Sequence, residues 1–194
     1  MAYHYEIGYN RTFFDELNLG GAIFYSDVRD KIQSEYINKK NSQGKLLRQF
    51  KNVGDAKFYG FELSAVWFLA NELELGANYT YMDYDLSSDE DGKEVYLSDV
   101  PRHKFFAYLD WEFAPKWSLY ASGEIQSKSL SSYNNDEKYY ARGFGVTNLK
   151  VGYEPFEGLK INAGVNNIFD KYYEYTEGYS EDGRTFFVNL RYDF

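Results

Sequence analysis

Apolar and polar residues alternate strictly at the end of the chain. From Thr185 to Phe194 every second residue is apolar, and the residues between them are mostly polar. A period of two places successive side chains on opposite faces, so it predicts a β-strand with one apolar and one polar face. The apolar face includes Leu190, Tyr192 and Phe194, which means that the pattern continues to the last residue.

The same period recurs in about nine stretches along the chain. Tight connections near 12–16, 70–72, 114–116 and 154–158 alternate with long polar loops near 37–47, 85–97, 127–141 and 173–183. Short turns at one end and long loops at the other are typical of outer-membrane barrels, whose turns are periplasmic and whose loops are extracellular. We therefore predict an all-β, antiparallel up-and-down transmembrane β-barrel of about nine or ten strands.

Aromatic residues mark the strand ends beside the short turns. Trp67, Phe113, Trp117 and Phe156 fall there, where an interfacial aromatic girdle is expected. The third strand is predicted to start at about Arg48. A soluble antiparallel sandwich also has alternating strands. It would need separate explanations for the alternating loop lengths and the aromatic strand ends.

Composition supports the barrel over a helical membrane protein. Aromatic residues make up 21% of the 194 residues, with 21 Tyr and 16 Phe, yet the mean hydropathy is −0.61. No stretch approaches the roughly 20 apolar residues that a membrane helix needs. A net charge of −9 argues against nonspecific binding of nucleic acid. The first ten residues lack the pattern of a secretory signal, so an exported protein with this sequence is expected to be longer or processed.

Four segments resemble the C-terminal barrel region of TonB-dependent outer-membrane receptors. The first runs from Asn52 to Glu62 and is similar to the family's N-x-G-x-A-x-x-x-G-x-E strand. The others are Val100–His103, the N-N-I-F-D-K-Y-Y segment that begins at Asn166, and Gly183-Arg184 before the terminal aromatic strand. They occur in the family's order over nearly the whole chain.

The resemblance implies a specific domain organisation. Residues 1–194 would be the C-terminal β-barrel portion of a receptor with about 22 strands, and the plug domain would be absent from this sequence. The full receptor would lie in the bacterial outer membrane and import a scarce solute such as an iron-siderophore, haem or cobalamin. Its partners would be outer-membrane lipid, the plug, the TonB energy-coupling protein, the barrel-assembly machinery and the iron chelate or other small ligand. No cofactor is implied.

The motif residues are interpreted as structural. Glycine in a strand usually marks a bulge, a bend or a close approach, and in a full receptor the plug is the expected neighbour. Asn and Asp at a strand end bond nearby backbone groups. The residues assigned this role are Asn52, Gly54, Ala56, Gly60, Glu62, Asn166, Asn167, Phe169, Asp170, Tyr172, Gly183 and Arg184.

Aromatic residues in the long loops are the candidates for ligand contact, because aromatic and polar groups together suit an amphipathic chelate. The candidates are Tyr133, Tyr139, Tyr140, Tyr175 and Tyr179.

Catalytic and metal sites find little support in the sequence. With two histidines and no cysteine, the usual zinc ligand sets are not available. Ser98 is the only serine close in sequence to His103, and a spacing of five places the two on opposite strand faces. The acidic run with Asp89 and Asp91 does not match an EF-hand. We expect neither an enzyme nor a bound metal.

A second hypothesis remains open at this point. The chain could be a small self-contained barrel that acts as a passive pore or a structural anchor. That hypothesis predicts an even number of strands and closure between Tyr3–Tyr9 and Thr185–Phe194, whereas a fragment predicts two unpaired edges.

Overall fold

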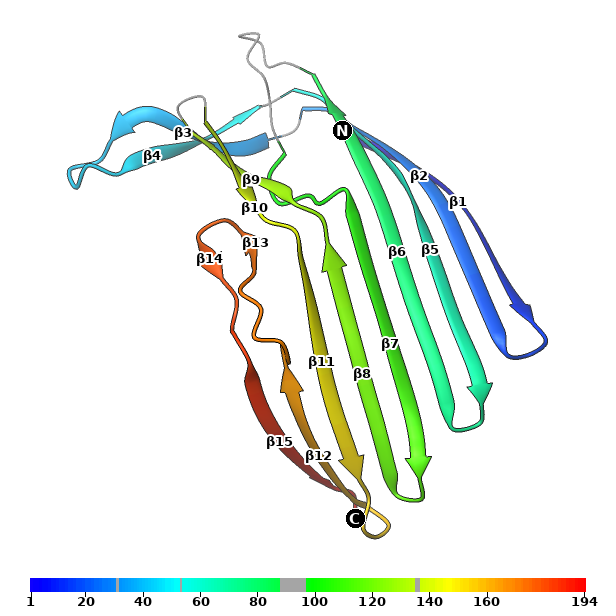
Figure 1. Ribbon diagram of the computed structural model, residues 1–194. Helices are drawn as coiled ribbons and strands as arrows, with labels where there is room; N and C mark the ends of the chain where they lie inside the picture. Colours follow the sequence, from blue (N-terminus) through cyan, green and yellow to red (C-terminus); the bar gives the residue numbers. More distant parts are fainter. Residues whose placement is uncertain (31, 53, 88–96, 135–136) are drawn as a thin grey trace.

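The computed structural model describes residues 1–30, 32–52, 54–87, 97–134 and 137–194, and Figure 1 shows these residues as strands and loops without a helix. Nine long strands form one antiparallel sheet in which each strand pairs with the next long strand along the chain. This confirms the predicted all-β, up-and-down topology. The strands are β1 Ala2–Phe13, β2 Leu17–Val28, β5 Ala56–Ala70, β6 Leu73–Leu86, β7 His103–Ala114, β8 Trp117–Gln126, β11 Phe144–Tyr153, β12 Leu159–Asn166 and β15 Thr185–Tyr192.

Three of the predicted polar loops contain hairpins of their own. Each is a separate two-stranded sheet at the end of the molecule opposite the short turns (Figure 1). The prediction that the third long strand starts near Arg48 is wrong, because Arg48 belongs to a hairpin and Gly54, with φ of 84°, lies between that hairpin and β5. The hairpins are β3 Ile32–Lys40 with β4 Leu46–Asn52, β9 Ser129–Asn134 with β10 Glu137–Ala141, and β13 Glu174–Thr176 with β14 Tyr179–Ser180.

Strand register places apolar residues opposite one another across the whole sheet. One row of directly paired residues crosses all nine strands, and every member is apolar. The row starts at the turn end of β1 and finishes at the loop end of β15, so successive strands are staggered, as strands tilted in a barrel must be. Its members are Phe13, Leu17, Trp67, Leu75, Leu109, Ala121, Leu149, Val165 and Phe186.

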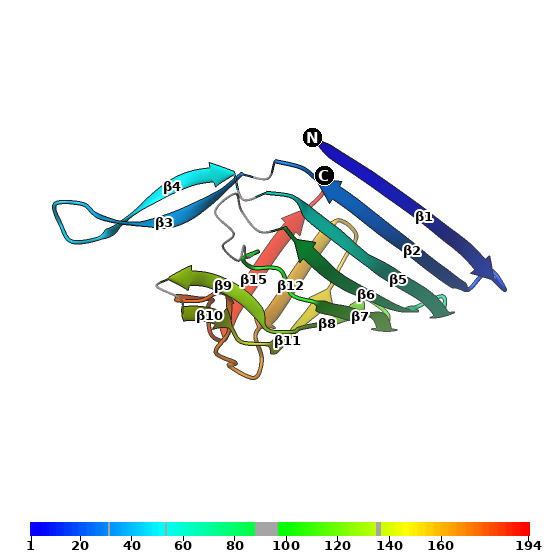
Figure 2. The same cartoon turned by 90° about the horizontal axis from the view of Figure 1, so that it is seen from above.

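The apolar face of the sheet, here called the outer face, has no protein layer over it. Ile23, Leu63, Val188 and Leu190 expose 60%, 52%, 70% and 66% of their surface. A soluble sheet covers its apolar face with a second layer. Figure 2, which looks down on the curved sheet, shows none there. The outer face therefore needs a nonaqueous partner.

The buried residues gather at the loop end of β8 and β11. Leu97, Leu130, Phe144 and Val146 are each less than 9% exposed and lie in or beside the hairpin β9–β10. The compact part of the described chain is thus the loop end, while the sheet itself is a single curved wall.

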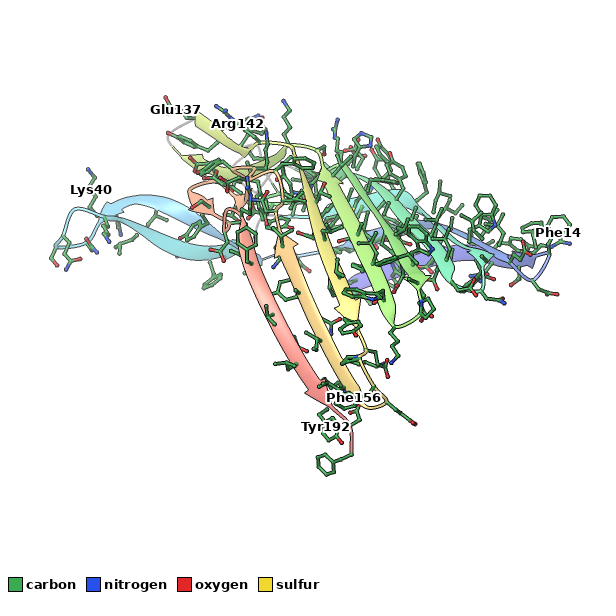
Figure 3. All side chains as sticks on the ribbon, turned by 60° about the horizontal axis from the view of Figure 1, so that its bottom comes forward. Phe14, Lys40, Glu137, Arg142, Phe156 and Tyr192 are labelled. Atoms are coloured by element: carbon green, nitrogen blue, oxygen red, sulfur yellow. The ribbon has the colours of Figure 1, made fainter. Side chains whose placement is uncertain are left out.

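Aromatic rings line the outer face near the short turns, as predicted. The Trp117 ring stacks on Tyr153 with centroids 4.3 Å apart, and Phe113 lies 6.4 Å from Trp117. Figure 3 places Phe156 and Tyr192 at this end and Glu137 and Arg142 at the other. Rings with polar edges favour the boundary between lipid and water, so this belt marks one membrane surface.

The sheet has two free edges within the described residues. Its order begins with β1 and finishes with β15, which are not paired with each other. The pairing of Tyr3–Tyr9 with Thr185–Phe194, which a self-contained barrel requires, is not present in the described sheet. The N-terminus lies at the loop end and the C-terminus at the turn end, where the Asp193 amide donates to the Gly158 carbonyl at 2.9 Å (Figure 1).

Glycines on the polar, inner face leave room for aromatic rings. A Cβ at Gly76 would overlap the ring of Tyr108 on β7, and a Cβ at Gly164 would lie 2.5 Å from the Phe187 ring on β15. Rings of this chain therefore approach these two glycines in the structure.

The matched pair Leu63 and Ser64, at the middle of β5, tests which face meets lipid. Both side chains are exposed, on opposite faces. We expect Leu63→Arg to lower the free energy of unfolding from phospholipid vesicles by ~2–4 kcal/mol, because it places a cation in hydrocarbon. Ser64→Arg should cost less than ~1 kcal/mol. Equal costs in denaturant titrations would contradict the assignment of the faces.

Candidate functional site

The hairpins β9–β10 and β13–β14 meet over the inner face of β8 and β11, and they form the candidate site. Phe144 on β11 lies 4.7 Å from the Tyr173 ring and 5.1 Å from the Tyr175 ring, between centroids. The Tyr175 ring meets Phe144 edge to face at 84°, an arrangement that aromatic quadrupoles favour. The sequence prediction missed Phe144, which lies outside the predicted loops, and Tyr173, which begins the predicted loop 173–183 but was not among the candidates.

Tyr175 is held by the sheet. Its hydroxyl donates to Glu124 Oε1 on β8 at 3.2 Å, and the Lys104 ammonium lies 3.5 Å from the same oxygen. Burial of the phenol, helped by the nearby Glu124 carboxylate, raises the pKa of Tyr175 to about 12. The hydroxyl therefore remains a donor at physiological pH.

The other predicted tyrosines differ in their surroundings. The Tyr139 hydroxyl donates to Glu137 at 2.7 Å, and this bond raises the pKa of Tyr139 above its usual value. The Tyr140 ring faces the Lys128 ammonium at 5.2 Å. Tyr179 is 75% exposed in β14. Tyr133 belongs to β9, and its side chain lies outside the described part of the chain.

The N-N-I-F-D-K-Y-Y segment closes the loop end of β12. Asn167 is 2% exposed and has a φ of 51°. Its amide oxygen accepts from the Lys171 amide at 2.7 Å, and its amide nitrogen donates to the Lys171 carbonyl at 2.8 Å and the Asp182 carbonyl at 3.3 Å. The Asn167 backbone amide donates to Asn148 Oδ1 on β11 at 2.9 Å. One side chain thus joins both ends of the segment that carries β13 and β14.

Neighbouring motif residues complete this connection. Asp170, with φ of 53°, accepts the Arg184 amide at 2.8 Å, and its carboxylate lies where a Cβ at Gly183 would meet it at 2.8 Å. Asn166 donates to Thr185 at 3.4 Å. Phe169 and Tyr172 are 76% and 70% exposed; the Tyr172 hydroxyl donates to Glu174 within the same segment.

The Asn52–Glu62 segment joins a hairpin to the sheet. Ala56 is fully buried, and Asp55 exchanges bonds with Ser87 across to the end of β6 at 2.7 and 2.9 Å. A Cβ at Gly60 would overlap the Tyr81 carbonyl, and Glu62 is exposed. The side chain of Asn52 lies outside the described residues.

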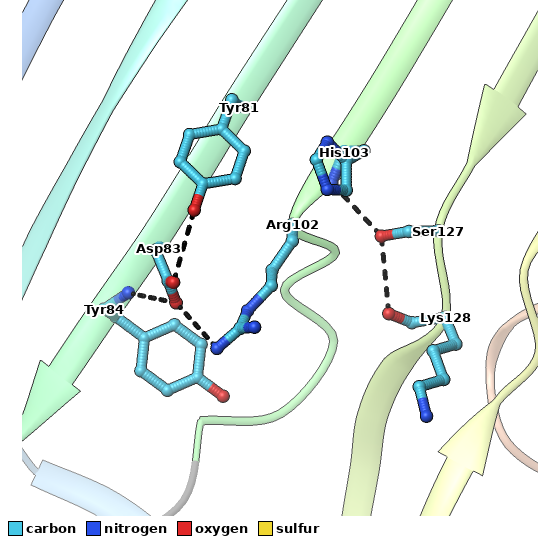
Figure 4. Close-up of polar contacts among 7 residues, drawn as sticks. All are labelled: Tyr81, Asp83, Tyr84, Arg102, His103, Ser127 and Lys128. Atoms are coloured by element: carbon cyan, nitrogen blue, oxygen red, sulfur yellow. Dashed lines mark hydrogen bonds and ion pairs between the residues drawn. The ribbon is translucent and has the colours of Figure 1, made fainter.

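Polar contacts also link β6, β7 and β8 at the loop end (Figure 4). The Arg102 guanidinium lies 3.1 Å from Asp83, and the His103 amide donates to Ser127 Oγ at 3.1 Å. The His103 ring contacts the Tyr79 hydroxyl at 2.7 Å and shares no hydrogen bond with Ser98 in the described structure. This histidine therefore links β7 to β6 through Tyr79 and to the end of β8 through Ser127.

No group of three His, Asp or Glu side chains that could hold a metal occurs among the described residues. The acidic run with Asp89 and Asp91 lies outside them. A cavity of about 890 Å³ lies at the opposite, turn end, with Glu112, Lys116, Gly152 and Asn162 in its lining. This cavity is separate from the candidate site formed by the hairpins β9–β10 and β13–β14.

Residues 1–168 match the family described as TonB dependent receptor-like, beta-barrel. The chain belongs to this family of TonB-dependent receptors. Its relatives are transport receptors of the bacterial outer membrane, and that is the location of this barrel segment. The family match and the sheet topology agree with the resemblance seen in the four sequence motifs.

The curated relatives of this chain are much longer than its 194 residues. The iron-regulated outer membrane virulence protein of Vibrio cholerae serotype O1 is 27% identical, with 86% of this chain and 27% of that protein aligned. The ferric-pyoverdine M114 receptor of Pseudomonas sp. is 26% identical, over 98% of this chain and 24% of its own. This chain therefore spans about a quarter of the length of these relatives.

Solved structures share the fold over the whole of this 194-residue chain. The ferric-catecholate import receptor Fiu of E. coli K12 superposes with a TM-score of 0.77 at 21% identity, covering 100% of this chain and 27% of that one. The pyoverdine receptor FpvA of Pseudomonas aeruginosa PAO1 gives 0.76 at 25% identity, covering 100% and 30%.

The adjacent asparagines Asn166 and Asn167 form a matched test of the motif. We expect Asn167→Ala to lower the free energy of unfolding by ~2–4 kcal/mol, because it removes three part-buried hydrogen bonds to the backbone of Lys171 and Asp182. Asn166→Ala, which removes one long exposed bond, should cost less than ~1 kcal/mol. Denaturant titration in detergent measures both, and a similar small cost for the two variants would refute the structural role of Asn167.

Proposed function

We propose that the chain is the C-terminal barrel portion of a longer TonB-dependent receptor that imports a scarce solute, an iron-siderophore or haem being the best-supported class. The complete receptor would have a plug domain and would be coupled to an energy source. Both would come from polypeptide outside residues 1–194. This goes beyond the family assignment, because the chain spans only about a quarter of its relatives.

The observation that carries the proposal is the open wall. Nine strands with two free edges and an uncovered apolar face leave backbone donors and acceptors without partners at β1 and β15. Unsatisfied backbone groups cannot persist in lipid, so further strands must complete the ring. Residues 1–168 match a family of large barrels. The remaining strands of such a receptor are the simplest source of the missing partners.

The solute class is inferred from relatives. Those named above are an iron-regulated protein and a ferric-pyoverdine receptor, and another relative is the heme/hemopexin utilization protein C of Haemophilus influenzae at 23% identity. Iron is the common element in their names, and two of the three names specify an iron chelate. In this proposal the wall of β-strands encloses the path, and the hairpins at the loop end contribute to the ligand face.

The proposed ligand face uses the exposed hairpin tip. Tyr179 has a 75% exposed ring with no partner among the described residues, whereas Tyr175 is engaged by Glu124. Tyr139 and Tyr140, on the neighbouring hairpin, complete the aromatic candidates. The receptor transports its solute unchanged in this account, without catalysis or a resident cofactor.

Uptake by the complete receptor tests the function. In iron-starved cells that lack their own receptors, we expect receptor-dependent accumulation of a radiolabelled ferric siderophore or haem from a panel, and loss of this accumulation when TonB is deleted. Uptake that persists without TonB, together with steady conductance in planar bilayers, would instead indicate a passive pore and overturn the proposal.

Substitution of Tyr179 tests the ligand face through equilibrium binding of the radiolabelled chelate to the complete receptor. We expect Tyr179→Ala to weaken binding of the accepted chelate about five- to thirty-fold, since loss of an aromatic contact typically costs ~1–2 kcal/mol. The control is Phe14→Ala, which removes a 91% exposed ring at the turn end. Unchanged affinity for Tyr179→Ala would remove this residue from the ligand face.

A further inference from the structure

The hairpin β13–β14 is connected to two strands of the wall through one carboxylate. Glu124 Oε1 accepts the Tyr175 hydroxyl at 3.2 Å from the hairpin and lies 3.5 Å from the Lys104 ammonium on β7. The Glu124 side chain is 23% exposed. Tyr175 itself is 38% exposed, so the bond is partly open to water. A hydrogen bond to a charged acceptor is nevertheless stronger than one between neutral groups.

Aromatic packing against β11 supports the same connection between the hairpin and the wall. The Phe144 side chain, 6% exposed on β11, contacts both Tyr173 and Tyr175. Tyr173 and Tyr175 also meet edge to face, with centroids 5.8 Å apart. The Tyr175 ring is therefore fixed by packing, and its hydroxyl is directed at Glu124 without further ordering.

A second attachment lies on the neighbouring hairpin. The Glu177 backbone amide donates to Ser131 Oγ at 2.8 Å, and the Ser131 hydroxyl donates to Asp99 at 2.9 Å. Ser131 is 6% exposed in β9. Two attachments, at Tyr175 and at Glu177, lie on one side of the turn and restrict its rotation.

The tip beyond these attachments is exposed, and its Gly178 amide donates to Glu174 Oε2 of the same hairpin at 3.3 Å. Gly178 has a φ of 81° and forms the turn, and Tyr179 and Ser180 are exposed. A hairpin of two very short strands has little stability of its own. Its position therefore depends on the attachments to the wall.

We infer that Tyr175 and Glu124 form a clasp that fixes the hairpin β13–β14 to the inner face of the wall. Tyr175 is a positioning residue, and the hairpin is a static part of the loop end that presents Tyr179. This inference concerns the hairpin's position and holds whichever solute is transported.

Spin-label mobility in the complete receptor tests the clasp. Residues 1–194 contain no cysteine, so Ser180→Cys provides a single label site within them at the exposed tip. In this background we expect Tyr175→Phe, which keeps the ring, and Glu124→Ala, which removes the acceptor, each to increase the mobile fraction of the spectrum at least two-fold. The double variant should add little, because both changes break one contact.

The control is Tyr172→Phe, which removes a hydroxyl that bonds Glu174 inside the same segment. It should leave the spectrum unchanged. Hydrogen exchange gives an independent readout at the Glu177 amide, which should exchange roughly three- to ten-fold faster in the clasp variants. Heat-modifiable gel mobility checks that every variant is folded, and Glu124→Ala carries the test if Tyr175→Phe is unfolded.

An immobile label in both clasp variants would overturn the inference, as would a label that is already mobile in the parent protein. Equal effects of Tyr172→Phe and Tyr175→Phe would also overturn it, since the contact with the wall would then be irrelevant. The outcome is separate from the uptake assay, because a broken clasp is visible in the spectrum even when no solute is transported.

Discussion

Strand register is the constraint on which the rest of the structure depends. Because side chains alternate with a period of two, one residue of slip in any pair would turn a strand's apolar residues to the wrong face. The row from Phe13 to Phe186 crosses nine strands without a polar member. Its neighbouring row on the inner face includes Asn18, Ser122 and Asn148. Lipid on one side and a hydrated interior on the other account for this division.

The loop end follows a different rule. Within the described residues, most of the buried side chains gather around β9, β10 and the start of β11, where hairpins fold over the inner face. This part has a small protein core, with Phe144 at its centre and Asn167 and Ser131 as its buried polar connections. The wall depends on lipid and the loop end depends on packing, so a substitution in one should leave the other in place.

The sequence predicts the wall well and the hairpins poorly, for physical reasons. Alternation fixes a strand and its face locally, which is why the long strands and the short turns were found. The hairpin β13–β14 was predicted as a loop because its strands are only three and two residues long and acquire their position from distant contacts such as Tyr175 with Glu124. Phe144 and Tyr108 break the polar parity, and only the structure shows the neighbouring residues that accommodate their rings.

The motif residues show the same distinction. Positive φ at Asn167 and Asp170 is a local property that Asn and Asp tolerate, and their position after a strand predicted a structural role. The partners at Asn148 and Asp182 are nineteen and fifteen residues away, so the sequence could not identify them. The roles assigned to the tyrosines of the ligand face stay predictions.

The most direct test of the account is the environment of each residue along β5 in a lipid bilayer. Single cysteines from Phe58 to Trp67 would be spin-labelled in the complete receptor, leaving out Gly60, where a Cβ would overlap the Tyr81 carbonyl. Their collision rates with oxygen and with a water-soluble nickel complex would then be compared. The account predicts strict alternation, with oxygen favoured at Tyr59, Phe61, Leu63, Ala65 and Trp67, and the nickel complex favoured at the residues between them. Absence of a period of two, or the opposite phase, would contradict the claim that this wall faces lipid with its apolar row.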